Sequence, residues 1–198
     1  MALYLSIIAV GSILLYAVDI IFAMPAMGFT PGYLAIAVIM SVAYQFAVDA
    51  IAAFVICRLP SKWFSKDKKI FNVSKKEQKL YEFFGIRKWK DKVWELGKLN
   101  GFSKSSIDKP NDPAYIERFF IESNKGVTEH IVSILAGFTV ILCFPIKYVW
   151  IITFPIAMIN LLLNTMSTMI LRYNYPKLQT LYKRATRNLE FKQKEDTK

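Results

Sequence analysis

The sequence predicts an all-α, polytopic membrane protein in which about four transmembrane helices flank a basic, helical insert. Hydrophobic residues make up 54% of the 198 residues, and the mean hydropathy is +0.30. Such a chain is too apolar for an ordinary soluble domain of this length. The apolar residues also gather in long runs, and the Lys and Arg residues lie almost wholly outside them.

The first two transmembrane helices are expected over Ala2–Met24 and Tyr33–Cys57. Each run contains a single charged residue, Asp19 in the first and Asp49 in the second. Each is long enough to cross ~30 Å of hydrocarbon at ~1.5 Å per residue. The first run is interpreted as a retained helix, because it lacks the basic start of a signal peptide and its apolar stretch is longer.

Residues 58–126 form the basic insert, which we expect at the membrane surface. Ser74 and Glu77 have the spacing of a capping box, which predicts a helix start. That helix is expected to stop at Gly85, since glycine suits a left-handed helix end. A second helix is predicted from Arg87 to Leu99.

A third helix of the insert is predicted to begin at Asp112-Pro113, an N-cap followed by proline, and to lead into the next span. The second apolar half is expected to hold two spans, a short one over Val127–Phe144 and one over Tyr148–Leu171, separated by a turn at Pro145. The chain is thus divided into 1–57 (two spans), 58–126 (insert), 127–171 (two spans) and 172–198 (basic tail).

The distribution of basic residues predicts the topology. The first 57 residues contain no Lys or Arg, residues 58–125 contain 17 of the 26, and residues 172–198 contain eight. Because cytoplasmic segments carry the excess of Lys and Arg, the insert and both termini are expected in the cytoplasm of a bacterial cell membrane.

Composition also excludes several classes of protein. The net charge of +11 is explained by attraction to anionic lipids beside the spans, so no nucleic-acid partner is expected. Cys57 and Cys143 are predicted on opposite sides of the membrane, which excludes a disulfide framework. One histidine and two separated cysteines also argue against a His/Cys zinc site.

Polar residues within the spans require an explanation, because they are costly in lipid. Gln45 and Asp49 share a helix face, and so do Asn160 and Asn164, since each pair is four residues apart. Two interpretations stay open. The pairs line a polar cavity, or they form hydrogen bonds that fix helix packing.

His130 is the only histidine and the side chain best suited to general base chemistry near neutral pH. It follows Glu129 and lies eight residues after Glu122, where the insert enters the third span. Arg172 and Asn174 close the fourth span. The predicted topology brings these residues to the same surface as the stretch Arg87–Lys92. Membrane-interface roles remain the alternative for His130 and Arg172.

These residues resemble those of a known family. The matching stretches are Phe84-Gly85-Ile86-Arg87-Lys88-Trp89-Lys90-Asp91-Lys92, Glu95–Lys98, Gly101-Phe102, Arg118 to His130, and Asn164 to Asn174. In order and spacing they resemble the glycosyl-4,4'-diaponeurosporenoate acyltransferases, small bacterial membrane proteins of carotenoid glycolipid synthesis.

The resemblance implies an acyltransferase that moves a fatty acyl chain onto a hydroxyl of a glycolipid, a carotenoid glycoside or a related lipid. The expected catalytic residues are His130 as general base, with Glu122 or Glu129 to orient it. The expected substrate-binding residues are Arg87, Lys88, Trp89, Lys90, Asp91, Asn164, Arg172 and Asn174.

No permanently bound cofactor and no metal site are expected. The co-substrate is an acyl donor, namely acyl-CoA, acyl carrier protein or a phospholipid, and the partners are membrane lipids and the glycolipid acceptor. The alternative is a non-catalytic lipid-binding or assembly protein. A small transporter that uses Asp19, Asp49 and Gln45 is disfavoured, because the sequence has no inverted repeat.

Overall fold

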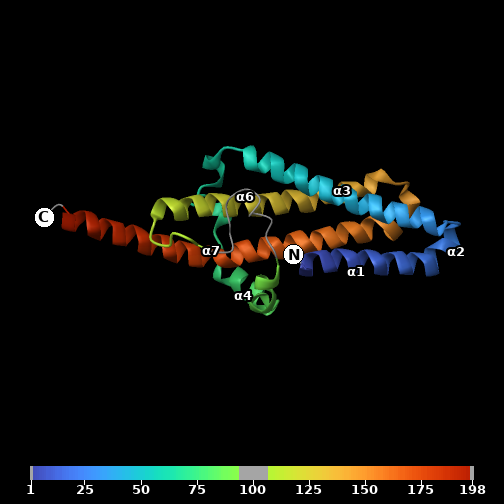
Figure 1. The fold of residues 1–198 in the computed structure, drawn as a ribbon, viewed down its shortest axis with the longest axis horizontal. Helices are drawn as coiled ribbons and strands as arrows, with labels where there is room; N and C mark the ends of the chain where they lie inside the picture. Colours follow the sequence, from blue (N-terminus) through green and yellow to red (C-terminus); the bar gives the residue numbers. More distant parts are fainter. Residues whose placement is uncertain (1, 94–106, 197–198) are drawn as a thin grey trace. The chain divides into compact units, whose positions relative to one another are not determined.

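The computed structural model describes residues 2–93 and 107–196, and these residues are helical with no β-strand among them (Figure 1). The α-helices are α1 (Ala2–Val18), α2 (Met24–Met27), α3 (Pro31–Arg58), α4 (Lys75–Phe83), α5 (Ile86–Trp89), α6 (Pro113–Gly137) and α7 (Phe154–Asp196). Short 3₁₀ helices cover Ser61–Phe64, Lys69–Phe71, Lys90–Lys92, Phe138–Cys143 and Ile146–Tyr148.

Four helical segments are long and apolar enough to cross a membrane, which confirms the predicted number. They are Leu3–Met27, Pro31–Arg58, Pro113–Cys143 and Val149–Glu195. The chain is therefore an all-α membrane protein of the polytopic type.

The helices of the second half extend beyond the predicted spans. Helix α6 begins at Pro113 and continues through Val127 to Gly137 as one unbroken helix. Helix α7 continues past Arg172 to Asp196 with Pro176 inside it. A proline within a helix costs roughly 3 kcal/mol, and side-chain contacts of α7 around Pro176 offset this cost.

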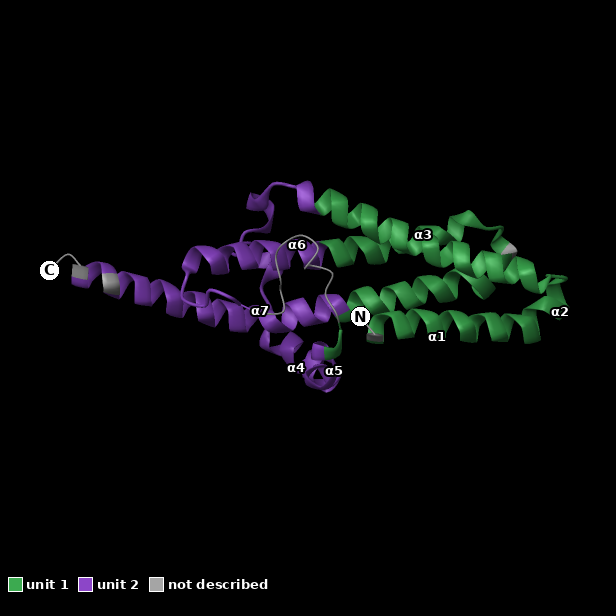
Figure 2. Ribbon diagram, viewed as in Figure 1, with its two compact units in different colours: residues 1–56, 92–94, 129–166 green, residues 57–91, 95–128, 167–198 purple. Residues whose placement is uncertain are grey.

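The described chain divides into two compact units (Figure 2). Unit 1 comprises residues 1–56, 92–94 and 129–166, and unit 2 comprises residues 57–91, 95–128 and 167–198. Helices α6 and α7 each contribute one part to each unit.

The core of unit 1 lies between α1, α3 and the start of α7. Leu34 and Val38 of α3 are buried against Ile152 and Ile156, and Leu15 of α1 packs on this cluster. Large apolar side chains also lie on the outside of unit 1, including Ile13, Phe22, Ile36, Ile39 and Ile51. An apolar surface this extensive is expected where lipid covers the helices.

Two π-helical turns interrupt the spans of unit 1, at Asp19–Ala23 and at Val149–Thr153. Each is followed by a helix with a proline at its second position, Pro25 in α2 and Pro155 in α7. A proline ring is costly after a regular helical turn, because it clashes with the carbonyl four residues earlier. The wider turn relieves this clash.

Unit 2 contains the helix ends that the sequence predicts. The Ser74 hydroxyl accepts a hydrogen bond from the Glu77 backbone N–H at 3.1 Å and so caps α4. Gly85 adopts a left-handed conformation with φ of 66° between α4 and α5. The Asp112 carboxylate accepts hydrogen bonds from the N–H groups of Ala114 and Tyr115, which confirms the start of α6.

The predicted helix from Arg87 to Leu99 is described only in part, as α5 and the 3₁₀ turn Lys90–Lys92. Residues 94–106 lie outside the described residues, and with them Trp94, Glu95–Lys98 and Gly101-Phe102.

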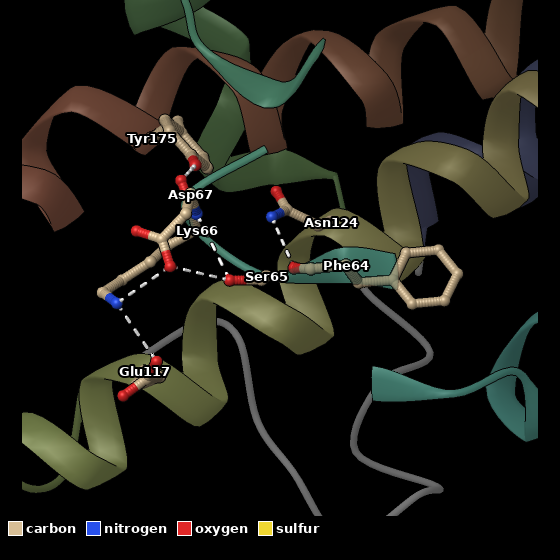
Figure 3. Close-up of polar contacts among 7 residues, drawn as sticks. All are labelled: Phe64, Ser65, Lys66, Asp67, Glu117, Asn124 and Tyr175. Carbon is tan, nitrogen blue, oxygen red and sulfur yellow. Dashed lines mark hydrogen bonds and ion pairs between the residues drawn. The ribbon is translucent and has the colours of Figure 1, made fainter. Parts of the chain in front are cut away.

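The first loop of the insert is fastened to α6 and α7 within unit 2 (Figure 3). The Lys66 ammonium lies 3.1 Å from Glu117 of α6, and the Tyr175 hydroxyl of α7 donates to the Lys66 carbonyl at 3.3 Å. The Asn124 amide donates to the Phe64 carbonyl at 2.9 Å. These contacts hold residues 61–67 and explain part of the continuation of α7 beyond Arg172.

Candidate functional site

A chain of polar side chains runs between α6 and α7 inside unit 1. Nδ1 of His130 lies 2.8 Å from Oδ1 of Asn164. Nδ2 of Asn164 donates to Oδ1 of Asn160 at 2.8 Å, and Nδ2 of Asn160 donates to the backbone carbonyl of Ser133 at 3.2 Å. The two asparagines that the sequence places on one helix face thus connect the histidine to the backbone of its own helix.

The backbone carbonyl at the end of this chain fixes the tautomer of His130. The Ser133 carbonyl is only an acceptor, so the amide nitrogen of Asn160 must face it. The Asn160 oxygen then accepts from Asn164, and the Asn164 oxygen faces His130. Nδ1 of His130 must therefore carry the proton, and in the neutral ring Nε2 carries the basic lone pair.

A small cavity adjoins this chain within unit 1. It is lined by polar residues of α1 and α3, namely Tyr4, Ser12, Gln45 and Asp49, by Asn160 of α7, and by apolar side chains including Phe46 and Ile159. Its volume of about 30 Å³ has room for about two water-sized groups. Asn160 lines this cavity and also belongs to the series of hydrogen-bonded side chains that leads through Asn164 to His130.

Several oxygen atoms on the cavity wall lack a partner among the residues that the structure describes. These are Oδ1 of Asp49, Oε1 of Gln45 and Oγ of Ser12, all buried. The Asp49 carboxyl also interacts with the side chains of Ser133, Asn160 and Asn164. Buried polar atoms are normally hydrogen-bonded, and these oxygens are themselves fully buried instead of being exposed to the cavity.

Gly137 of α6 makes the close packing at this cavity possible. The Gln45 amide donates to the Gly137 carbonyl at 2.9 Å. A Cβ atom on Gly137 would lie 2.3 Å from the Asn160 amide nitrogen and 2.8 Å from the Gln45 amide oxygen. Any larger residue at this position would therefore require these two side chains to move.

Glu129 belongs to the same unit. Its carboxylate and that of Asp49 are both within electrostatic range of the Tyr4 hydroxyl. His130, Glu129 and Asn164, which the sequence singles out for catalysis and binding, thus all lie in unit 1. The residue at Nδ1 of His130 is Asn164, which was expected to bind substrate, and an orienting role of Glu122 or Glu129 stays a prediction.

The remaining predicted site residues lie in unit 2, so their gathering with His130 at one surface stays a prediction. Arg172 of α7 donates to the Glu77 carboxylate of α4 through Nε and Nη2, the latter at 3.0 Å, and Nη2 also donates to the Asn72 carbonyl. The Arg172 side chain is only 17% exposed. Its charge is therefore already paired within unit 2, in contrast to the expected donor contact.

The Tyr81–Lys92 segment is tied to α7 by a second set of bonds. Arg87 pairs with Glu82, and its Nε donates to the Tyr173 hydroxyl at 3.0 Å. The Tyr173 hydroxyl also donates to Glu82 at 3.3 Å. Trp89 packs against the buried cluster of Tyr81, Ile86 and Tyr173 and donates to the Phe84 carbonyl.

Of the other charged residues of this segment, Lys88, Asp91 and Lys92 are exposed and Lys90 is half-buried. Lys90 pairs with Asp91 at 2.8 Å. Glu122 of α6 and Asn174 of α7 are half-buried. The Arg87 side chain is 70% exposed even though it is paired.

Charge pairing within unit 2 shifts two pKa values. Burial raises the pKa of Glu77, but hydrogen bonds from Arg172, Tyr81 and the Ser74 region outweigh it and hold the pKa below its usual value. Burial and the neighbouring Glu77 carboxylate raise the pKa of Tyr81 to about 12. At neutral pH the Glu77 carboxylate is ionised and the Tyr81 hydroxyl is protonated.

Sequence reasoning missed Tyr4, Ser12 and Gly137. Tyr4, Ile8 and Ser12 all line the cavity, and their spacing of four residues places them on one helix face. This four-residue spacing could have predicted that the three residues lie on one face of the helix. Within the described residues, no group of three or more His, Cys, Asp or Glu side chains is placed to hold a metal ion.

Comparison with known proteins confirms the resemblance seen in the sequence. The family model for glycosyl-4,4'-diaponeurosporenoate acyltransferase matches residues 60–184, which is more than half of the chain. That range includes His130, Asn164 and Arg172, whereas the cavity residues of α1 and α3 precede it. The curated proteins and the solved structures that were compared contain no match to the chain. On the family match, the chain belongs to the glycosyl-4,4'-diaponeurosporenoate acyltransferase family and is an acyltransferase.

Proposed function

We propose that the protein transfers a fatty acyl chain from an activated donor to a sugar hydroxyl of a membrane glycolipid, a carotenoid glycoside or a related lipid, with His130 as the general base. The observation that carries this proposal is the hydrogen bond from Nδ1 of His130 to Asn164. It presents Nε2 as the basic atom, and a general base of this kind contributes typically 10²–10⁴-fold to a rate.

In the proposed reaction, Nε2 of His130 takes the proton of the acceptor hydroxyl as the hydroxyl oxygen attacks the acyl carbonyl carbon. The tetrahedral intermediate collapses, the bond to the donor's leaving group breaks, and the leaving group takes the proton back from the imidazolium. An ester and the free leaving group result. Transfer is direct, and no acyl-enzyme is formed.

The neutral amide of Asn164 suits this role. A carboxylate at Nδ1 would favour the charged imidazolium. An amide oxygen orients the ring and selects the tautomer without adding a negative charge.

The acyl donor is proposed to be acyl-CoA, acyl carrier protein or a phospholipid, used as a co-substrate without a permanently bound cofactor. Each carries phosphate, and exposed cations of the insert suit phosphate as charge-assisted partners. Lys88 and the largely exposed Arg87 support this assignment. We propose that Arg172 instead holds α4 on α7, because Glu77 occupies its guanidinium.

The enzyme is proposed to work at the cytoplasmic face of a bacterial cell membrane, with both termini in the cytoplasm. The support is the absence of Lys and Arg from the first 57 residues and their abundance in the insert and the tail. The donors named above that are soluble also occur on that side of the membrane.

The test is acyl transfer by the purified protein in lipid nanodiscs, with a glucosylated lipid as acceptor and a labelled fatty acyl group on each of the three donor classes in turn. Mass spectrometry would identify the product. We expect one donor class to give a sugar-acylated lipid, and no product with the same acceptor after its sugar hydroxyls are methylated. Absence of transfer from all three donors, or equal transfer to the methylated acceptor, would contradict the proposal.

A further inference from the structure

Helix α4 of unit 2 has two different faces. One face is held on α7, because Glu77 accepts a hydrogen bond from Arg172 and Tyr81 is buried in a cluster with Tyr173. The other face carries two basic and two apolar side chains, all exposed, at the spacing i, i+3, i+4, i+7 of one helix face. These are Lys76, Lys79, Leu80 and Phe83. The face away from α7 thus combines apolar groups with positive charges.

The apolar part of this face forms a patch with the residue that follows α4. Phe83 is 83% exposed and Leu80 is 52% exposed. Phe84 is 58% exposed, and its ring lies edge to face against that of Phe83, with the centroids 5.6 Å apart. Single exposed apolar residues are normal, but a group of large ones side by side marks an interaction surface.

The contacts of α4 with α7 place this patch near the end of a membrane span. Residues 154–171 of α7 contain no charged side chain, and Arg172 is the first. Met169 of this apolar part packs on the buried cluster around Tyr81, and Arg172 binds Glu77. Helix α4 therefore lies beside the point at which the apolar part of α7 ends, and lipid headgroups are expected at that level.

The charges beside the patch select the kind of surface that covers it. Lys76 and Lys79 are exposed, and neither forms an ion pair among the residues that the structure describes. A lysine stem lies along apolar surface while its ammonium group reaches a phosphate. An anionic leaflet supplies both partners at this depth, phosphates for the lysines and acyl chains for the aromatic rings.

We infer that the outer face of α4 docks on the anionic lipids of the membrane surface. Leu80, Phe83 and Phe84 enter the boundary between headgroups and acyl chains, and Lys76 and Lys79 bind the lipid phosphates. One face of the helix is thereby held by α7 and the other by lipid. Docking of this kind is independent of the proposed acyl transfer and takes place whether or not a substrate is bound.

The test places a fluorescent reporter on this face of the full-length protein. Cys57→Ser and Cys143→Ser remove the native thiols, and Phe83→Cys supplies one for a nitrobenzoxadiazole label. The protein is reconstituted into phosphatidylcholine nanodiscs in which the share of phosphatidylglycerol is raised stepwise from zero. A phospholipid with a nitroxide near the start of its acyl chain quenches a label that enters the leaflet. The same label at Glu190→Cys, an exposed position of α7, gives the reference.

We expect quenching at position 83 to rise with the share of phosphatidylglycerol and to exceed the reference several-fold. Lys76→Gln with Lys79→Gln should shift this titration to a higher share of the anionic lipid. The docking equilibrium should weaken about fivefold for each lysine removed, in line with the contribution of one lysine near an anionic surface.

Lys183→Gln with Arg187→Gln is the matched control. It removes the same number of exposed positive charges from α7 and should leave the titration unchanged. Because all four basic residues are exposed, both double variants should unfold at the wild-type temperature.

Three results would overturn the inference. Quenching at position 83 that stays at the level of position 190 would show that the patch does not meet lipid. A label that is shielded from water but not quenched by the nitroxide lipid would show that a protein surface covers the face instead. Equal titrations for the α4 and α7 double variants would show that Lys76 and Lys79 do not bind the headgroups.

Discussion

Nδ1 of His130 lies 2.8 Å from Oδ1 of Asn164, and Asn164 in turn donates to Asn160 at the same distance. This link between α6 and α7 gives the only histidine of the chain a defined tautomer. Because Nε2 is then the basic atom, the contact connects helix packing in unit 1 to the proposed chemistry.

Replacement of Asn164 by alanine is expected to slow acyl transfer by roughly 10–100-fold, because the imidazole loses its orientation and tautomer control. The effect should appear in kcat, with little change in KM for the glycolipid. Thr180→Ala, which removes an exposed hydroxyl of α7 bonded only to the Pro176 carbonyl, should leave both constants unchanged. A change in KM alone would point to substrate binding instead.

Replacement of Asn164 by aspartate tests the same contact by adding a negative charge beside Nδ1 of His130. A carboxylate at Nδ1 stabilises the imidazolium form of the ring, so less neutral base is present at a given pH. The acidic limb of the pH–rate profile should therefore move to higher pH. If the acidic limb does not shift, His130 is not the group that takes part in the rate-limiting proton transfer.

Gly137→Ala is expected to disturb the cavity directly. The new methyl group would overlap the Asn160 amide nitrogen and the Gln45 amide oxygen, and overpacking of this kind costs typically 1–3 kcal/mol. Both the thermal unfolding temperature in detergent and the transfer rate should fall. Gly32→Ala is the control, since nothing lies within 4 Å of its added Cβ. Equal behaviour of the two variants would show that the cavity packing is looser than described.

The ion pair of Glu77 with Arg172 predicts a pH dependence of stability. The pKa of Glu77 is held below its usual value of 4.5, so the ionised form stabilises the fold at neutral pH and that stability is lost as the pH falls through the lowered pKa. Glu77→Gln should lower the free energy of unfolding by about 1–3 kcal/mol at pH 7 and by much less near pH 3.

The measurement is thermal unfolding of wild type and variant between pH 7 and pH 3. Glu190→Gln, which removes an exposed carboxylate of α7, is the control and should change neither value. A cost of Glu77→Gln that stayed constant over this range would contradict the role of the ionised pair.

The turn between α4 and α5 needs a glycine. Gly85 has a φ of 66°, a region that costs other L-residues roughly 1–2 kcal/mol. Gly85→Ala should destabilise the protein by about that amount, and Gly85→Asn by less, because asparagine tolerates this conformation. Equal unfolding temperatures for all three proteins would show that the turn relaxes.

Signals that act over a few residues were sufficient to predict much of the fold. The Ser74 cap, the Gly85 turn and the Asp112 cap depend on chemistry within four residues, and all three are confirmed. The number of transmembrane spans likewise follows from the lengths of the apolar runs in the sequence. These features need no knowledge of distant neighbours.

Long-range contacts decided what the sequence did not predict. Helix α7 continues beyond the predicted fourth span, and there Tyr175 and Arg172 bond to insert residues about 100 positions earlier. The pairs Gln45/Asp49 and Asn160/Asn164 were each recognised as a helix face. That they border one cavity depends on how α3 and α7 pack, which periodicity alone does not give.

The most direct test of the central claim is the acyl-transfer rate of purified His130→Ala protein beside that of wild type, with thermal unfolding to confirm the fold. We predict a fall in kcat of at least 100-fold at pH 7, with normal unfolding and continued binding of the glycolipid. Wild-type activity in the folded variant would contradict the assignment of His130 as the general base.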